Sequence, residues 1–110
     1  WKQLGQIING KANSDYFGVS ISFSVDGKSL AIGAPGYNMP GFVQVFYIED
    51  DGTGSSWKKL GQDINGEEHG DHSGWSVSLS SDGKTLAIGS NFNSDIGYRS
   101  GHVRIFGLEV

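Results

Sequence analysis

The sequence contains one segment twice, at a spacing of 56 positions. Residues 1–34 and 57–90 align without a gap, and 20 of the 34 aligned pairs are identical. A further match, between residues 41–48 and 101–108, follows a loop that is four residues longer in the second copy. Repeats of this length are supersecondary units that bury their apolar faces against one another. The fold is therefore expected to pack equivalent units side by side.

Each copy predicts four antiparallel β-strands. In one of them Val19, Ile21 and Phe23 alternate with serines, which is the period of two that a half-buried strand shows. No segment has a 3.6-residue period, so we expect essentially no helix. The predicted units are residues 1–56 (outer strand 1–8, then three strands within 18–48) and residues 57–110 (outer strand 57–64, then three strands within 74–108).

Turn residues separate these strands at equivalent places. Asp26-Gly27 and Asp82-Gly83 each predict a tight hairpin, because glycine accepts a positive φ at little cost. Asp15 and Asp71 also occupy equivalent loop positions, where an aspartate commonly holds a turn through hydrogen bonds to the backbone. We expect all of these residues to be structural.

Composition limits the classes of function. The chain has 18 glycines, 18% charged residues and no cysteine, which suits short strands and tight turns and rules out disulfides. The net charge is −4 and no basic cluster exceeds Lys58-Lys59, so nucleic-acid binding is not expected. No apolar run approaches the roughly 18 residues of a membrane-spanning helix.

Four-stranded antiparallel units repeated at about 56 residues favour an all-β fold of β-propeller blades. Small serine side chains on one face would let neighbouring sheets approach closely. A propeller ring needs about 4–8 blades, so we expect this chain to be part of a larger ring or assembly. The alternative is a two-sheet sandwich built by duplication.

Three stretches of the first copy resemble a known family. They are Phe17-Gly18-Val19-Ser20, then LAIGAPG at 30–36, then GFVQVFY at 41–47. These resemble the FG-GAP repeat, which forms the propeller of integrin α subunits and of many extracellular proteins. The whole pattern is also similar to tandem repeats in predicted surface proteins of algae and marine microbes. The resemblance implies a propeller fold and an extracellular or cell-surface setting, without implying an activity.

The chain departs from that family in its metal loop. FG-GAP blades often carry an acidic calcium loop between the first two strands, whereas each hairpin here has a single acid, Asp26 or Asp82. Calcium needs 6–8 oxygen ligands, so the family's metal role is not carried over. The inserted loop offers a different calcium candidate, with oxygens on Asn91, Asn93 and Asp95. We expect folding to need no cofactor.

Other candidate site residues are weaker. His69 and His72 lie in an acidic loop and could ligate zinc, although the first copy keeps only the equivalent aspartate. Trp1 and Trp57 open equivalent strands and are expected to pack between blades, with sugar stacking as the alternative. Trp75 falls on the apolar face of its strand and is also expected in the core. No catalytic constellation is present.

These observations favour a non-enzymatic extracellular module for binding, adhesion or structural assembly. A carbohydrate-binding lectin-type propeller is the alternative, and a metal-dependent enzyme ranks third. Partners would be further copies of the repeat, with residues 1–8 of one copy pairing beside residues 102–108 of another, and a glycan or a protein as a further ligand. This pairing follows because the chain opens with the last strand of one blade and closes with the third strand of another.

Overall fold

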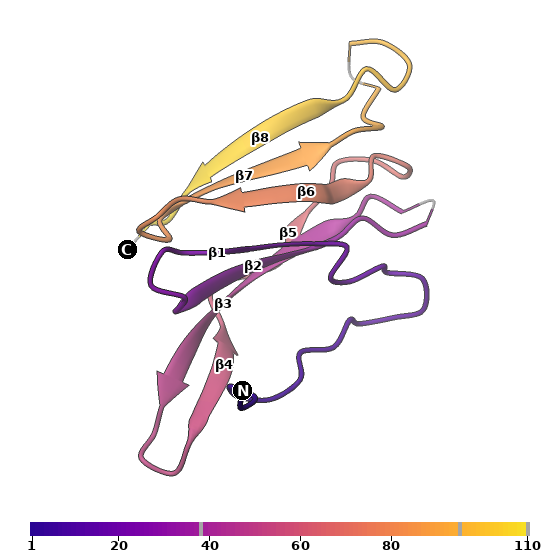
Figure 1. The fold of residues 1–110 in the computed structure, drawn as a ribbon. Helices are drawn as coiled ribbons and strands as arrows, with labels where there is room; N and C mark the ends of the chain where they lie inside the picture. The colour runs from indigo at the N-terminus through magenta and orange to yellow at the C-terminus, as the bar shows by residue number, and fades with distance from the viewer. Residues whose placement is uncertain (38, 95, 110) are drawn as a thin grey trace.

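The computed structural model describes residues 1–37, 39–94 and 96–109. All of the regular structure in this part of the chain is β-strand, which confirms the expected fold class (Figure 1). The strands are β1 (Ser20–Phe23), β2 (Ser29–Ala34), β3 (Phe42–Asp50), β4 (Ser55–Lys59), β5 (Ile64–Asn65), β6 (Ser73–Leu79), β7 (Thr85–Ser90) and β8 (His102–Gly107). They form two antiparallel sheets.

The first sheet crosses the boundary between the two sequence repeats. Its strand order is β1-β2-β3-β4, and β5 also pairs with β3. Phe46 lies opposite Lys59 and Phe42 lies opposite Asn65, so the opening segment of the second repeat is the outer strand of this sheet. The expected single strand at 57–64 is split into β4 and β5, because Gly61 between them has a φ of 77°.

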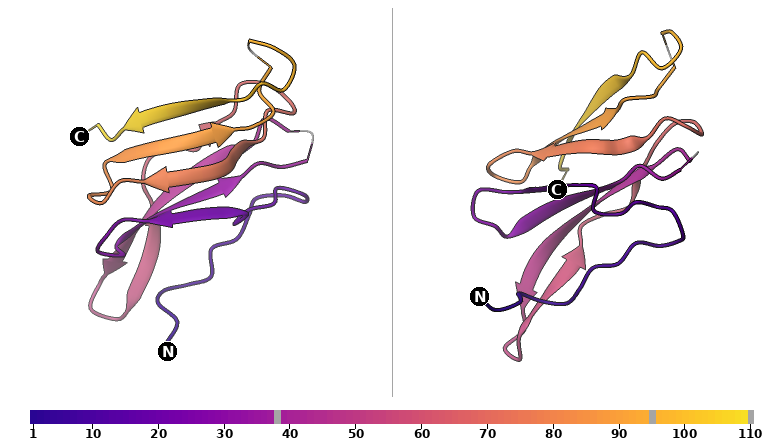
Figure 2. Two further views of the ribbon diagram at one scale, coloured as in Figure 1. Left: turned by 45° about the horizontal axis from the view of Figure 1, so that its top comes forward. Right: turned by 45° about the vertical axis from the view of Figure 1, so that its right-hand side comes forward.

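The second sheet has only three strands, in the order β6-β7-β8. β8 pairs with β7 along one edge, and no strand of the described residues pairs with its other edge. The expected strand at 1–8 is not formed, which corrects the sequence-based prediction. Figure 2 shows that the N-terminus lies beside the first sheet, on the opposite side of the molecule from β8.

The two sheets stack face to face around a shared apolar core. The buried residues of this core are Ala31, Val43, Leu79, Leu86 and Ile88. Small residues bring the backbones close, as the sequence predicts. Ser22 Oγ accepts a hydrogen bond from the Leu79 N–H (2.9 Å), and Ser20 Oγ donates to the Gly74 carbonyl (2.8 Å). A Cβ at Gly33 would lie 2.1 Å from that same Gly74 oxygen.

The outer faces of the stack are apolar, as expected for propeller blades. A closed two-sheet sandwich places polar residues on its outer faces. Here Val103 and Ile105 on the outer face of the second sheet are 63% and 70% exposed. Trp75 on β6 is about half exposed, so the burial in the core that the sequence predicts for it is not found in the described chain.

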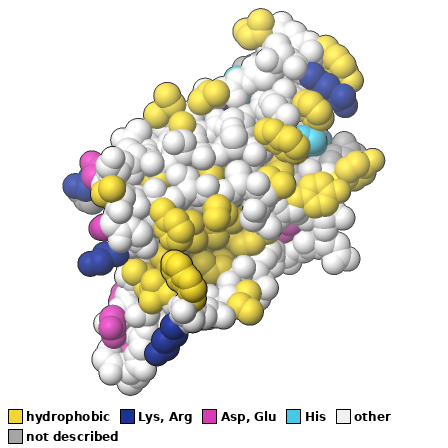
Figure 3. Space-filling model, in the orientation of Figure 1, with side chains coloured by type: hydrophobic (Ala, Val, Ile, Leu, Met, Phe, Trp, Pro, Cys, Tyr) yellow, Lys and Arg dark blue, Asp and Glu magenta, His cyan; other side chains and the backbone are white. Residues whose placement is uncertain are grey.

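The N-terminal segment covers part of the opposite outer face, on the first sheet. Trp57 is buried there, as expected, in a cluster with Leu30, Ile32 and Phe46, against which Ile8 and Phe17 pack. Trp1 is fully exposed, so the packing expected of it is not found within one chain. Figure 3 shows hydrophobic side chains gathered in the middle of this face of the molecule.

The two Asp-Gly hairpins have the same hydrogen bonds. Asp26 Oδ1 accepts from Ser24 Oγ and from the Lys28 N–H, at 2.7 and 2.9 Å. The equivalent distances at Asp82 are 2.8 and 3.0 Å. Gly27 and Gly83 have φ values of 70° and 73°. Each hairpin is therefore fixed by the aspartate and by a glycine in the left-handed region.

Glycine at 33 and its equivalent at 89 allow a matched test of the close packing. Gly33→Ala should lower the free energy of unfolding by about 2 kcal/mol, because its methyl group would overlap the Gly74 backbone. The methyl group of Gly89→Ala would lie 2.3 Å from the movable Ser76 hydroxyl and close to no backbone atom, so this variant should lower the free energy of unfolding by about 1 kcal/mol or less. Urea unfolding of both variants measures the difference, and equal losses would show that the sheets do not depend on this contact.

Candidate ligand-binding surface

The variable loops gather at one end of the stacked sheets. Figure 1 shows the loops before β1, after β2, before β6 and after β7 at the same end, with the two Asp-Gly hairpins at the other. Apart from residues 38 and 95, these loops include residues 11–17, 35–41, 67–72 and 91–101. In propellers such loop ends carry ligand sites. We therefore expect a ligand site at this end of the sheets.

Asp15 and Asp71 organise two of these loops from buried positions. Asp15 Oδ2 accepts hydrogen bonds from the N–H groups of Lys11 and Ala12, at 3.0 and 2.8 Å. Asp71 Oδ2 accepts from the Glu68 N–H (3.0 Å) and from Asn93 Nδ2 (3.1 Å). Both carboxylates thus hold backbone, and the second also ties the inserted loop to the loop before β6.

The calcium candidate is placed only in part. Asp95 lies outside the described residues. Asn93 is buried, and its Nδ2 points to the carboxylates of Asp71 and Glu67. Asn91 has a buried Oδ1 without a hydrogen-bond partner among the described atoms. Within the described ranges, no group of three or more His, Cys, Asp or Glu side chains is arranged to hold a metal ion.

An aromatic cluster occupies the same loops. The His72 ring lies 4.4 Å from the Phe92 ring and 6.1 Å from the Trp75 ring, and the Arg99 guanidinium lies 4.5 Å from Phe92. A shallow pocket of about 220 Å³ is lined by Tyr37, Gly70, His72, Phe92 and Arg99. An aromatic ring can stack on the apolar face of a sugar ring, and a neighbouring cation can donate hydrogen bonds to the sugar hydroxyls.

The backbone is strained at two residues of this pocket. His72 and Arg99 have φ values of 59° and 52°, which non-glycine residues seldom adopt. Tyr16, the equivalent of His72 in the first copy, has a φ of 56°. Strain of this kind is concentrated at ligand sites. His72 was a zinc candidate in the sequence, but its aromatic neighbours could be identified only from the structure.

A charged cluster around Asp63 was missed by the sequence analysis. Asp63 accepts hydrogen bonds from Lys11 and Lys59, both at 2.6 Å, and from Gln44 at 2.9 Å. Partial burial acts to raise the pKa of Asp63, but these three hydrogen bonds outweigh it and hold the pKa well below its ordinary value. The cluster fastens the N-terminal segment to the first sheet, and only the fold brings its members together.

The comparison with protein families identifies one segment. Residues 65–106 match the family model described as FG-GAP repeat. The match covers β6, β7 and β8 up to Phe106, and it confirms the resemblance to the FG-GAP repeat that was drawn from the sequence. No curated protein matches the chain. None of the described residues forms a helix that could cross a membrane.

Replacement of Asp63 tests the charged cluster. Asp63→Asn should lower the free energy of unfolding by about 1–2 kcal/mol at pH 7, because two half-exposed lysines lose their partner. The folded-state pKa lies below the unfolded one, so this stabilisation is complete above about pH 5, falls as the pH drops below about 4, and is lost only as the pH passes through the lower folded-state pKa. Unfolding curves at pH 7 and pH 3 measure it. The exposed Glu68→Gln is the control, and a loss that is unchanged at pH 3 would contradict the assignment.

Proposed function

Because residues 65–106 form an FG-GAP-like repeat, we propose that the chain is a building block of an extracellular β-propeller-type protein. Copies of the repeat would stack into a larger surface that serves binding, adhesion or structural assembly. The proposal is non-enzymatic and includes no cofactor. The observation that carries it is that the two ends of the stack expose the same faces that meet in its middle.

The contact between the two sheets shows how two repeats pack, and the same contact could form between two copies of the chain. The first sheet contributes Ala31, Val43 and Val45 to the shared core. The equivalent residues of the second sheet are Ala87, Val103 and Ile105, of which Val103 and Ile105 are exposed. Ser76 and Ser78, the equivalents of the two serines that bond across the interface, are exposed as well. The free face of the second sheet therefore matches the docking face of the first.

The other end of the stack offers the complementary face. Val77 and Leu79 of the second sheet pack into the shared core. Their equivalents in the first sheet are Ile21 and Phe23, which are 59% and 52% exposed. One end of a molecule therefore fits the other end of a second one. Such heterologous contacts close into a ring or continue as a filament.

The unpaired edge of β8 supports the same proposal. An open strand edge presents unsatisfied backbone groups that pair readily with another chain. Residues 1–8 are equivalent to the segment that pairs with β3, and β8 is equivalent to β3. We therefore infer that residues 1–8 of one copy pair with residues 102–108 of another.

A carbohydrate-binding function is the second candidate. It is favoured by the pocket between Tyr37, His72, Phe92 and Arg99, which combines aromatic faces, a cation and a strained backbone. This pocket lies at the loop end of the sheets, so sugar binding would be compatible with assembly. A glycan array separates the two: binding that His72→Ala removes, without a change in oligomeric state, would support a lectin role.

Light scattering on the purified chain tests the assembly. The wild type should associate at micromolar concentration. Gly89→Ala should weaken this association by about tenfold, since its methyl group would enter the place that the Gly74 oxygen occupies at Gly33. Gly97→Ala, in an open loop position, is the matched control and should associate normally. A wild-type chain that stays monomeric at several hundred micromolar would contradict the proposal.

A further inference from the structure

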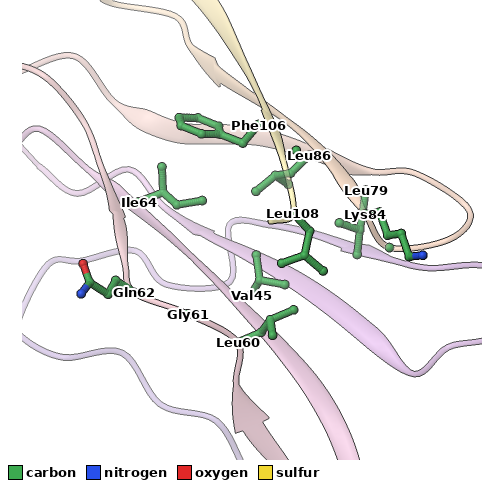
Figure 4. A pocket seen from close by; sticks show the side chains of 12 residues that line it. Val45, Leu60, Gly61, Gln62, Ile64, Leu79, Lys84, Leu86, Phe106 and Leu108 are labelled. Carbon is green, nitrogen blue, oxygen red and sulfur yellow. The ribbon is translucent and has the colours of Figure 1, made fainter. Parts of the chain in front are cut away.

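A cavity of about 210 Å³ lies beside the free end of β8, between the two sheets. Figure 4 shows aliphatic and aromatic side chains converging on it from β3, β7, β8 and the β4–β5 segment. The residues that define it are Leu60, Gly61, Gln62, Leu86, Phe106 and Leu108, and we call it the tryptophan socket. The name follows from what occupies the equivalent place in the first sheet.

In the first sheet that place is filled by the Trp57 side chain. Its indole packs against Leu30 and Phe46, with Ile48 beside them. The equivalents of these three residues in the second repeat are Leu86, Phe106 and Leu108, which line the socket. The socket therefore has the apolar walls of a tryptophan site without the tryptophan.

Two glycines show the same difference directly. Gly5 and Gly61 are equivalent and have φ values of 76° and 77°. A Cβ at Gly5 would lie 2.8 Å from Cδ1 of the Trp57 indole, whereas a Cβ at Gly61 would meet no atom within 4 Å. The backbone at Gly61 thus already has the conformation that accommodates an indole ring, and the space for the ring is open.

Polar groups complete the comparison. Gln6 Nε2 donates to the Trp57 carbonyl and Gln6 Oε1 accepts from the Trp57 N–H, both at 2.8 Å. The Trp57 Nε1–H donates to the Leu4 carbonyl at 3.0 Å. One glutamine side chain therefore pairs with the outer edge of β4 as a neighbouring strand would. The equivalents Gln62 and Leu60 stand at the rim of the socket, where they have no such partner within the described chain (Figure 4).

We propose that the socket binds Trp1 of a second copy of this chain. The inference rests on the proposed assembly and names the contact that locks it. Seven of the nine residues in 1–9 are identical to their equivalents in 57–65, and Trp1 is fully exposed. Transferring the register of the first sheet places Trp1 opposite Leu108 and Asn9 opposite His102. Gln62 then holds the Trp1 backbone at both its N–H and its C=O, and the Leu60 carbonyl accepts from the indole N–H.

The segment that carries Trp1 does not have to leave its own sheet to reach the partner. Residues 1–9 and 57–65 are equivalent in sequence, and their central glycines, Gly5 and Gly61, have nearly the same positive φ. Ile8 packs on the first sheet, and its equivalent Ile64 packs on the core that includes the second. One segment can thus cover its own sheet with one side and complete the partner's sheet along its edge.

The test uses sedimentation of the 110-residue chain in four forms: wild type, Trp1→Ala, Gln62→Ala and Thr53→Ala. Trp1→Ala removes the ring, and Gln62→Ala removes the two hydrogen bonds to the strand edge, so each should weaken association by about tenfold or more. Thr53→Ala, in the β3–β4 hairpin, is the control and should match the wild type. Thermal melting checks that all four chains fold.

Mixing the Trp1→Ala and Gln62→Ala variants is the most direct test of the socket. Trp1→Ala keeps an intact socket and Gln62→Ala keeps an intact Trp1, so the mixture should form heterodimers with wild-type affinity that do not extend further. Variants that associate like the wild type, or a mixture that gains nothing, would overturn the socket while leaving the assembly standing. A wild type that stays monomeric would overturn both.

Discussion

A β-sheet in this protein is complete only when the next repeat contributes its outer strand. β4 and β5 open the second repeat, yet they pair with β3 of the first. This exchange places the repeat boundary inside a sheet, so neighbouring repeats share backbone hydrogen bonds as well as an apolar face. The second sheet ends at β8 with a free edge because no third repeat supplies that strand within the described chain. The exposed faces, the tryptophan socket and the unpaired N-terminal segment all follow from this one arrangement.

The sequence predicts the strands well because each depends on local pattern. Alternation of Ile21 and Phe23 with serines, and the Asp26-Gly27 turn, act over a few residues, and the structure has the corresponding strands and hairpin. The strand expected at 1–8 is absent because strand pairing depends on how distant segments meet in the fold, which no local pattern reports. Burial of Trp75 was misjudged for a related reason, since alternation along a strand does not show how much of each side chain the rest of the fold covers.

The candidate sites were less predictable because they join residues from different loops and strands. The sequence singled out His72, but the contact of its ring with the Phe92 ring at the loop end depends on how the loops are placed. Asp63 gave no signal at all, since its three partners come from separate segments. Gln62 could have been recognised through its equivalent, Gln6, although only the structure shows that Gln6 binds the backbone of Trp57.

The central claim is that residues 1–9 of one copy pair with β8 of another in a defined register, and a disulfide tests it directly. The chain has no cysteine, so Asn9→Cys with His102→Cys introduces one possible bridge. Residues directly opposite in an antiparallel pair have Cα atoms about 4.5–5.5 Å apart, which suits a disulfide. Oxidation should give a ladder of disulfide-linked oligomers on a non-reducing gel, and the shifted pair Ile7→Cys with His102→Cys should give few. Monomers alone, or equal ladders from both pairs, would contradict the account.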